Sequence, residues 1–393
     1  MPSPQPLHRS FAAWGLALTI LCTTTAPVAA QRTFTEQTLP DAELRYIGPV
    51  PVAILTGTPE EMGRQHVDLL AADSDAAMDM PHRYAAEFGV DKLWPLIVSA
   101  GRTLILQAPE RHQRELAAAT ARFGKAEQEI IVANTLLELR RVGCSTLIVE
   151  PSRSATGAPI FGRNFDFLTL GELHKQSIVF VYRPIGLHAF ASVAFPGMIG
   201  VFSGMNDAGL ALATLDVEQS ADGSRKFEST GMPLAFAYRQ ILEECTTVDE
   251  AEALLRRIKP TTWMNLAVCD RAGGAIFEIT PGHVARRNDE GGVVRCTNHF
   301  RTAGMTTGET CWRYDRLCEL PAEGPLDLHS VHERLDAVNQ GEDTLQTMVF
   351  EPRDLVLHLA IGEPPVSDDP LTRIELRPFF EPAGGRGGTA SGK

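Results

Sequence analysis

The stretch that decides the fold is Gly143-Cys144-Ser145-Thr146, followed downstream by Gly162-Arg163-Asn164-Phe165-Asp166. The sequence before it is typical of helices and the sequence after it mostly of strands, so Cys144 lies at a junction. A small reactive side chain preceded by glycine, with an arginine and an aspartate following, suits nucleophilic catalysis. The pattern predicts a cut between Gly143 and Cys144, which makes Cys144 a new N-terminus.

Three features favour this chemistry. Gly143 lacks a Cβ, so a thiol can approach the bond before Cys144 closely. The cation of Arg163 favours the thiolate and lowers the thiol pKa from about 8.5. Asp166 can hold an amino group, and a freed α-amine with a pKa of about 7.7–8.0 can serve as general base. The alternatives are a Cys144 that is a small buried apolar residue and an Asp166 that is a turn residue.

Composition places the chain among soluble globular proteins. Its 393 residues are 44% hydrophobic and 22% charged, and the net charge is −13. A nucleic-acid partner requires a basic surface, so the charge argues against nucleic-acid binding.

The first thirty residues predict a signal peptide. His8 and Arg9 precede an apolar run over 11–22, and Val28-Ala29-Ala30 offers small residues for cleavage. The run is too short to span a bilayer, and no other stretch predicts stable membrane insertion. We therefore expect export of the mature chain to the periplasm or the medium; the alternative is a buried N-terminal helix.

Seven cysteines are present, of which the signal peptide would remove one. An oxidising compartment permits disulfides, but the spacing does not determine which cysteines pair. If Cys144 is a free nucleophile, an odd number remains, so we expect at least one more unpaired thiol. The remaining five are Cys245, Cys269, Cys296, Cys311 and Cys318.

Periodicity predicts a helical first third with about one strand, over 44–55, and a capped helix start at Thr58. From Ser145 onward it predicts a hairpin that brings Cys144 and Arg163 to the same end, and then sheets covered by helices. The last ten residues are glycine-rich and predict disorder. The helices are expected around 60–72, 75–88, 91–107, 109–123, 126–141, 233–245, 248–258 and 326–338.

Five motifs in order then resemble one family. They are the two quoted above and three more: Gly204-Met205-Asn206-Asp207-Ala208-Gly209-Leu210, Cys296-Thr297-Asn298-His299-Phe300 and Arg313-Tyr314-Asp315-Arg316-Leu317. Together they resemble the N-terminal-nucleophile hydrolases of the acyl-coenzyme A:isopenicillin N acyltransferase family, which is related to bile salt hydrolases and penicillin V acylases. The resemblance covers roughly 45–380.

The resemblance implies roles for six residues. Cys144 would be the nucleophile for self-cleavage and for substrate attack, and Arg163 and Asp166 would set the protonation of its thiol and amine. Asn298 would offer its side-chain amide to the oxyanion, and Arg313 would support the site electrostatically. The backbone N–H of Asp216 would be the second oxyanion donor. Bile salt hydrolases have Asn at that position, so bile-salt specificity is in doubt.

The resemblance also implies an α+β fold, a four-layer αββα sandwich with a helical pro-segment. The expected parts are the signal peptide 1–30, a helical N-terminal chain 31–143, a catalytic chain 144–383 and a disordered tail 384–393. The two processed chains would remain associated, and homo-oligomerisation is left open. We expect no cofactor and no metal; His329 and His332 have a metal-binding spacing, but no third ligand is evident nearby.

The expected activity is hydrolysis of an amide bond in a small N-acyl substrate, through an acyl-thioester on Cys144. An acyltransferase that passes the acyl group to an amine is one alternative. An uncleaved, non-catalytic binding protein on the same fold is another. Without the resemblance, Asn298 could simply cap a strand end and Arg313 could belong to a solvated ion-pair face.

Overall fold

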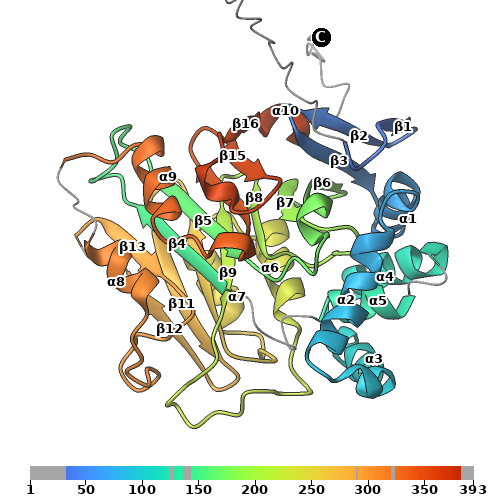
Figure 1. Ribbon diagram of the computed structural model, residues 1–393, viewed down its shortest axis with the longest axis horizontal. Coiled ribbons are helices and arrows are strands. Elements are labelled where there is room, and N and C mark those ends of the chain that lie inside the picture. The colour runs from blue at the N-terminus through green and yellow to red at the C-terminus, as the bar shows by residue number, and fades with distance from the viewer. Residues whose placement is uncertain (1–31, 124–126, 136–142, 289–290, 320–323, 382–393) are drawn as a thin grey trace, which may run out of the picture. The chain divides into compact units, whose positions relative to one another are not determined.

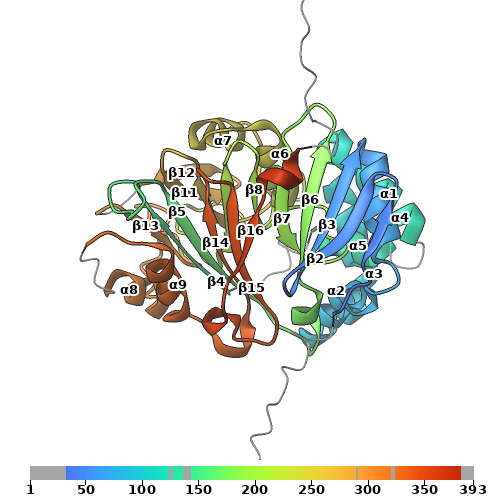
Figure 2. The same ribbon diagram turned by 90° about the horizontal axis from the view of Figure 1, so that it is seen from above.

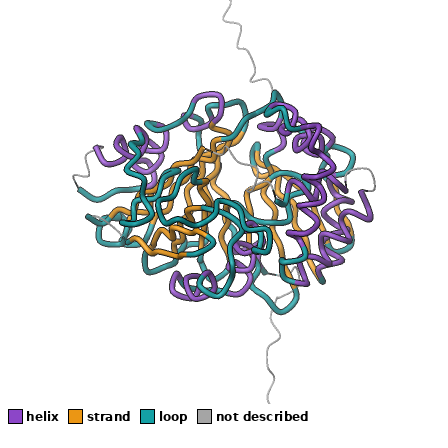
Figure 3. Tube along the Cα trace, turned by 90° about the horizontal axis from the view of Figure 1, so that it is seen from below, coloured by secondary structure: helices purple, strands orange, loops and turns teal. Residues whose placement is uncertain are grey.

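The structure is a computed structural model, which describes residues 32–123, 127–135, 143–288, 291–319 and 324–381. The predicted signal peptide and C-terminal tail lie outside these residues. Two sheets, a mixed one and an antiparallel one, form the centre, and helices lie at the periphery (Figure 3).

The larger sheet has ten strands in the order β1-β2-β3-β6-β7-β8-β9-β10-β11-β12. Every neighbouring pair is antiparallel except β3 and β6, which are parallel. The strands are β1 Gln37–Leu39, β2 Ala42–Ile47, β3 Val50–Gly57, β6 Ile178–Pro184, β7 Phe190–Ala194, β8 Ser203–Asn206, β9 Ala211–Asp216, β10 Met264–Cys269, β11 Gly274–Thr280 and β12 His283–Arg287.

The smaller sheet has six strands in the order β13-β4-β5-β14-β15-β16, and all its pairs are antiparallel. The hairpin β4–β5 therefore lies inside the sheet, which is why every residue of β5 is buried. The strands are β4 Gly143–Val149, β5 Ile160–Asp166, β13 Val293–Cys296, β14 Thr344–Glu351, β15 Val356–Ile361 and β16 Thr372–Glu375.

The helices cover the outer faces of the two sheets (Figures 1 and 2). In the larger sheet α1 packs on β3, α6 on β8 and α7 on β10 and β11, whereas α9 packs on β4, β5 and β14 of the smaller sheet. The α-helices are α1 Pro59–Leu70, α2 Asp75–Glu87, α3 Trp94–Ile105, α4 Glu110–Phe123, α5 Glu127–Ala133, α6 Leu234–Glu244, α7 Val248–Leu255, α8 Trp312–Glu319, α9 Leu328–Asp336 and α10 Arg377–Phe380. Short 3-10 helices are η1 Asp91–Leu93, η4 Leu173–Gln176, η5 Gly341–Asp343 and η6 Val366–Asp368.

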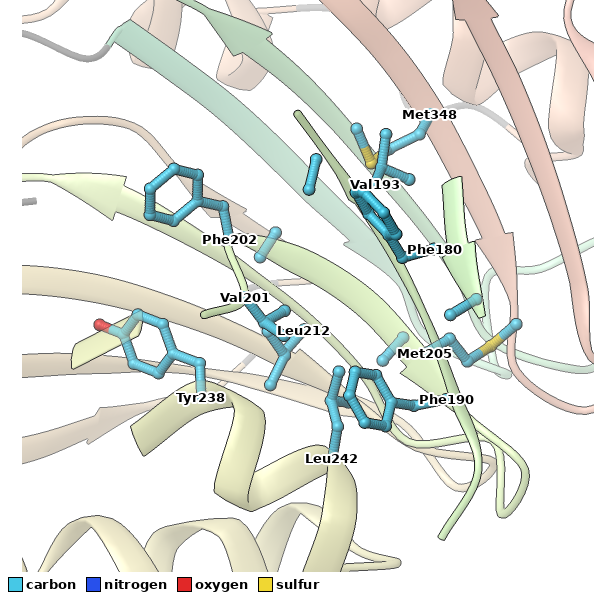
Figure 4. Close-up of a cluster of buried hydrophobic side chains, with 14 of the residues drawn as sticks. Phe180, Phe190, Val193, Val201, Phe202, Met205, Leu212, Tyr238, Leu242 and Met348 are labelled. Atoms are coloured by element: carbon cyan, nitrogen blue, oxygen red, sulfur yellow. The ribbon is translucent and has the colours of Figure 1, made fainter. Parts of the chain in front are cut away.

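The two sheets contact each other through β4 and β9 and through β11 and β13. One apolar cluster runs from Tyr238 and Leu242 on α6, through the larger sheet, to Met348 on β14 (Figure 4). With helices on both outer faces, the layers are helix, sheet, sheet and helix. The predicted α+β fold with four αββα layers is confirmed.

The predicted single strand over 44–55 is wrong, because the chain turns back within it. Ile47 pairs with Val50, so Gly48 and Pro49 form a two-residue connection between β2 and β3. Gly48 has a φ of 57°, which glycine adopts without steric cost. The N-terminal third therefore adds three strands to the larger sheet, and it is not the almost wholly helical segment that the sequence predicts.

The predicted helix start at Thr58 is confirmed. The Thr58 side chain accepts a hydrogen bond from the Glu61 backbone N–H, and the Glu61 side chain accepts one from the Thr58 backbone. This capping box, with Pro59 at the first turn, ends β3 and begins α1.

Candidate functional site

The hairpin β4–β5 brings Cys144 and Arg163 together, as the sequence predicts. Cys144 pairs with Phe165, and Thr146 pairs with Arg163, so Cys144 and Arg163 are diagonal neighbours on one face of the sheet. The Arg163 Nη2 lies 3.1 Å from the Cys144 Sγ, with both residues fully buried. Strand alternation accounts for the shared face of the two side chains.

The Arg163 guanidinium is held from the larger sheet. Its Nη2 donates to the Thr214 carbonyl at 2.9 Å, and its Nη1 to the Phe202 carbonyl at 3.3 Å. The carbon of the guanidinium lies 4.9 Å from the centre of the Phe165 ring. These contacts fix the cation beside the thiol.

Two opposing effects act on the Cys144 thiol. Burial raises its pKa above the ordinary value, whereas the Arg163 cation lowers it. Burial is the larger effect, so the thiol of the uncut chain is neutral at pH 7. Exposure of the thiol to solvent would remove the burial effect, which is the larger of the two, and so increase the thiolate fraction.

Asn298 and Arg313 hold the main chain of Cys144. The Cys144 N–H donates to the Asn298 Oδ1 at 2.9 Å, and the Cys144 carbonyl accepts from the Arg313 Nη1. The Arg313 Nη2 donates to the same Asn298 Oδ1 at 2.8 Å. Arg313 is only 7% exposed, so the alternative of a solvated ion-pair face is wrong.

Asp216 joins the group through its main chain. It ends β9, and its carbonyl accepts from the Asn298 Nδ2 at 2.8 Å. The Asn298 side-chain amide is therefore engaged by Asp216, Cys144 and Arg313. The oxyanion roles of Asn298 and of the Asp216 N–H stay predictions.

Asp166 ends β5 beside the bond that precedes Cys144, because it pairs with Gly143. It is 1% exposed and is the last residue of strand β5, so the alternative of a turn residue is wrong. Burial raises the pKa of its carboxyl group, while hydrogen bonds from Gln340 and Thr344 and the nearby Arg313 lower it. Its Oδ2 lies 4.0 Å from the Arg313 Nη1.

Gln340 and Thr344 were not predicted from the sequence. The Gln340 Nε2 donates to the Asp166 Oδ2, and the Thr344 Oγ1 donates to the Asp166 Oδ1, both at 2.7 Å. Neither residue lies in a recognisable motif. Only the pairing of β14 with β5, which places Thr344 opposite Asp166, brings this turn to the site.

An apolar pocket lies next to the hairpin. Its walls include Phe165, opposite Cys144, and Phe202, whose carbonyl binds Arg163. Its free volume is about 20 Å³, room for about one water molecule. The N-terminal segment supplies Ala77, Met80, Pro81 and Ala133, and the segment after Cys144 supplies Phe165, Phe167, Leu173, Phe195, Pro196, Met198 and Phe202.

Within the described part of the chain, no group of three His, Cys, Asp or Glu side chains is arranged to hold a metal ion. No described helix has both the length and the apolar character needed to cross a membrane. All six described cysteines are free thiols.

Several solved structures are similar to this chain. A variant of conjugated bile acid hydrolase from Clostridium perfringens is 14% identical with a TM-score of 0.46, and the match covers 60% of this chain and 93% of that one. An N-acylethanolamine-hydrolyzing acid amidase ortholog from Caenorhabditis elegans is 19% identical with a TM-score of 0.42, covering 57% and 96%. Penicillin V acylase from Agrobacterium tumefaciens is 16% identical with a TM-score of 0.41, covering 56% and 83%.

An uncharacterized protein of Archaeoglobus fulgidus is 23% identical over 285 residues, which are 62% of this chain. The match covers 47% of that protein, so this chain spans about half the length of the curated relative.

The sequence profile of the acyl-coenzyme A:6-aminopenicillanic acid acyl-transferase family matches residues 153–365, more than half of the chain. The matched span contains Arg163, Asp166, Asp216, Asn298 and Arg313, and begins after Cys144. The match confirms the family predicted from the sequence motifs. The chain belongs to the acyl-coenzyme A:6-aminopenicillanic acid acyl-transferase family, a family of enzymes.

Proposed function

We propose that the protein is a self-cleaving cysteine amidohydrolase, in which Cys144 becomes the N-terminal nucleophile of the processed enzyme. The observation that carries the proposal is the contact between the Cys144 Sγ and the Arg163 guanidinium, 3.1 Å apart in a buried site. Family membership supports an acyl-transfer chemistry, and the hydrogen bonds to the Cys144 main chain support a function for this residue beyond packing.

Self-cleavage would proceed through an acyl shift from nitrogen to sulfur. The Cys144 sulfur adds to the Gly143 carbonyl carbon, the bond from that carbon to the Cys144 nitrogen breaks, and the thiol proton passes to the leaving amine. Water then hydrolyses the thioester, releasing the Gly143 carboxylate and the free thiol. The new α-amine of Cys144 can serve as general base for the substrate reaction.

The processed enzyme would attack an amide carbonyl of an N-acyl substrate and hold its acyl group as a thioester on Cys144. The apolar pocket lined by Phe165 and Phe202 supports an apolar acyl group. Because the free volume of the pocket is small in the uncut chain, its side chains must move to admit such a group. Water as the acceptor makes the protein a hydrolase, and an amine acceptor makes it an acyltransferase.

We favour water as the acceptor. If residues 1–30 direct export, as predicted, the processed enzyme meets no acyl-coenzyme A, which is a cytosolic donor. An assay of a panel of N-acyl amides for released amine, with and without an added acceptor amine, separates the two outcomes.

Intact-mass measurement of the purified protein tests self-cleavage. We expect two fragments that separate before Cys144 in the wild type and one chain in Cys144→Ala. Cys318→Ala is the matched control, because Cys318 is an exposed thiol outside the site, and we expect it to cleave like the wild type. A single uncut chain in the wild type contradicts the proposal and favours a binding protein on the same fold.

A further inference from the structure

One turn, from Gln340 to Thr344 between α9 and β14, holds both oxygens of the Asp166 carboxylate. Gln340 donates to the Oδ2 and Thr344 to the Oδ1. The turn is closed on itself, because the Gln340 backbone N–H donates to the Thr344 Oγ1 at 2.8 Å. The carboxylate is therefore oriented by two side chains of one turn, and the hydroxyl of Thr344 is itself held by the Gln340 backbone N–H.

The same Gln340 amide packs against the residue before the predicted cut. A Cβ added at Gly143 would lie 2.1 Å from the Gln340 Nε2 and 3.1 Å from the Asp166 Cβ. Real Cβ atoms essentially never approach another atom within 3.0 Å. Gly143 has no positive φ that would favour glycine. The Gln340 amide ends a flexible side chain, but its hydrogen bond to the Asp166 Oδ2 at 2.7 Å holds it at this position beside Gly143.

We propose that Gln340 is a positioning residue for self-cleavage, which excludes side chains at position 143 and holds the Asp166 carboxylate beside the bond to be cut. The inference rests on the proposed function, since it assigns a role in that reaction. Gln340 acts through Gly143 and Asp166.

The steric part of the proposal predicts second-site rescue. Gly143→Ala needs about 1 Å more room than the Gln340 amide leaves, so either the amide leaves Asp166 or the backbone at residue 143 moves, and we expect cleavage to slow by about a hundredfold. Gly143→Ala combined with Gln340→Ala removes the overlapping amide, and we expect its cleavage rate to return to that of Gln340→Ala alone. Asn339→Ala is the control, because it removes the side chain that accepts from the Gly341 N–H of this turn and leaves the Gln340 amide in place.

A folding measurement keeps the steric part testable if Gly143→Ala is poorly folded. In the uncleavable Cys144→Ala background, Gly143→Ala should lower the melting temperature by a few degrees, as overpacking does, and Gln340→Ala should restore it. If Gln340→Ala restores neither the melting temperature nor cleavage, the steric role is overturned.

The hydrogen bond from Gln340 to Asp166 predicts that the pH profile of the cleavage rate is displaced in Gln340→Glu. This variant keeps the shape of the side chain but places a second carboxylate against Asp166, where both cannot be ionised. The acid limb of the cleavage rate should move to higher pH by at least about one unit. Gln340→Ala, which adds no charge, should not show this displacement. Equal profiles in Gln340→Glu and the wild type overturn the positioning of Asp166.

Cleavage of the wild type distinguishes a failure of the proposed function from a failure of the role of Gln340. If the wild type stays uncut, the proposed function fails. If the wild type cleaves and Gly143→Ala with Gln340→Ala stays as slow as Gly143→Ala, only the role of Gln340 fails.

Discussion

Replacement of Arg239 by Met tests the buried ionic cluster that joins the N-terminal segment to the rest of the protein. The Arg239 side chain on α6 is 1% exposed. Its Nη1 and Nη2 lie 2.9 and 2.5 Å from the two carboxylate oxygens of Glu115 on α4. Its Nε lies 2.8 Å from the Glu243 Oε1. Both carboxylates raise the pKa of Arg239 against the opposing effect of burial, so the guanidinium stays charged.

The expected cost is large because Arg239→Met leaves two buried carboxylates without this partner. Breaking a buried ion pair by removing one partner costs about 3–5 kcal/mol. After a cut before Cys144, Glu115 and Arg239 lie on different chains. The same free energy would then weaken the association of the chains by roughly two to four orders of magnitude.

Urea unfolding of the uncleavable Cys144→Ala chain measures the intramolecular cost. Arg286→Met is the matched control: Arg286 also contacts two carboxylates, those of Asp249 and Glu252, but its side chain is 31% exposed. We expect about 1 kcal/mol or less for this control. Adding Glu115→Gln to Arg239→Met should recover part of the loss. A cost for Arg239→Met equal to that of the control would refute the reasoning.

Two further predictions concern buried groups. Burial, with a smaller effect of Arg239, lowers the pKa of His66 to about 3, and its Nε2 accepts from the Gly197 N–H at 2.9 Å. Because the folded pKa lies below the unfolded one of about 6.5, His66 stabilises the fold above pH 6.5 and loses this contribution as the pH falls, by up to about 1.4 kcal/mol per pH unit. Urea titrations should show this slope reduced in His66→Gln, which cannot titrate; an unchanged slope would contradict the assignment. Arg163→Met removes the cation beside Cys144, so the thiol pKa rises further, and we expect cleavage to slow more than about tenfold at pH 7, with its rate profile displaced to higher pH. Intact-mass time courses at several pH values measure this, and an undisplaced profile would argue against a thiolate role for Arg163.

The sequence alone was sufficient for the family, the fold class and the hairpin. Strand alternation places Cys144 and Arg163 on one face, and the paired strands confirm it. The capped start at Thr58 was also predictable, because a capping box is a local pattern. The hairpin and the capping box depend on residues that are near neighbours in the chain or across one turn.

The sequence did not resolve the hairpin β2–β3, because residues that favour strands lie on both sides of Gly48 in the run over 44–55. The position of the turn depends on a positive φ at a single glycine. The prediction that the chain is divided at 143 is still open, although the structure shows that strands from both sides of that point share one sheet through β3 and β6.

Only the tertiary structure decided how the remaining site residues are arranged. Asn298 and Arg313 could have been a strand cap and part of a solvated face, and they instead hydrogen-bond to the main chain of Cys144. Gln340 reaches Asp166 across 174 positions of sequence. Such contacts form because β13 and β14 flank the hairpin in one sheet, and strand order is fixed by the packing of the whole core, which no local pattern of residues records.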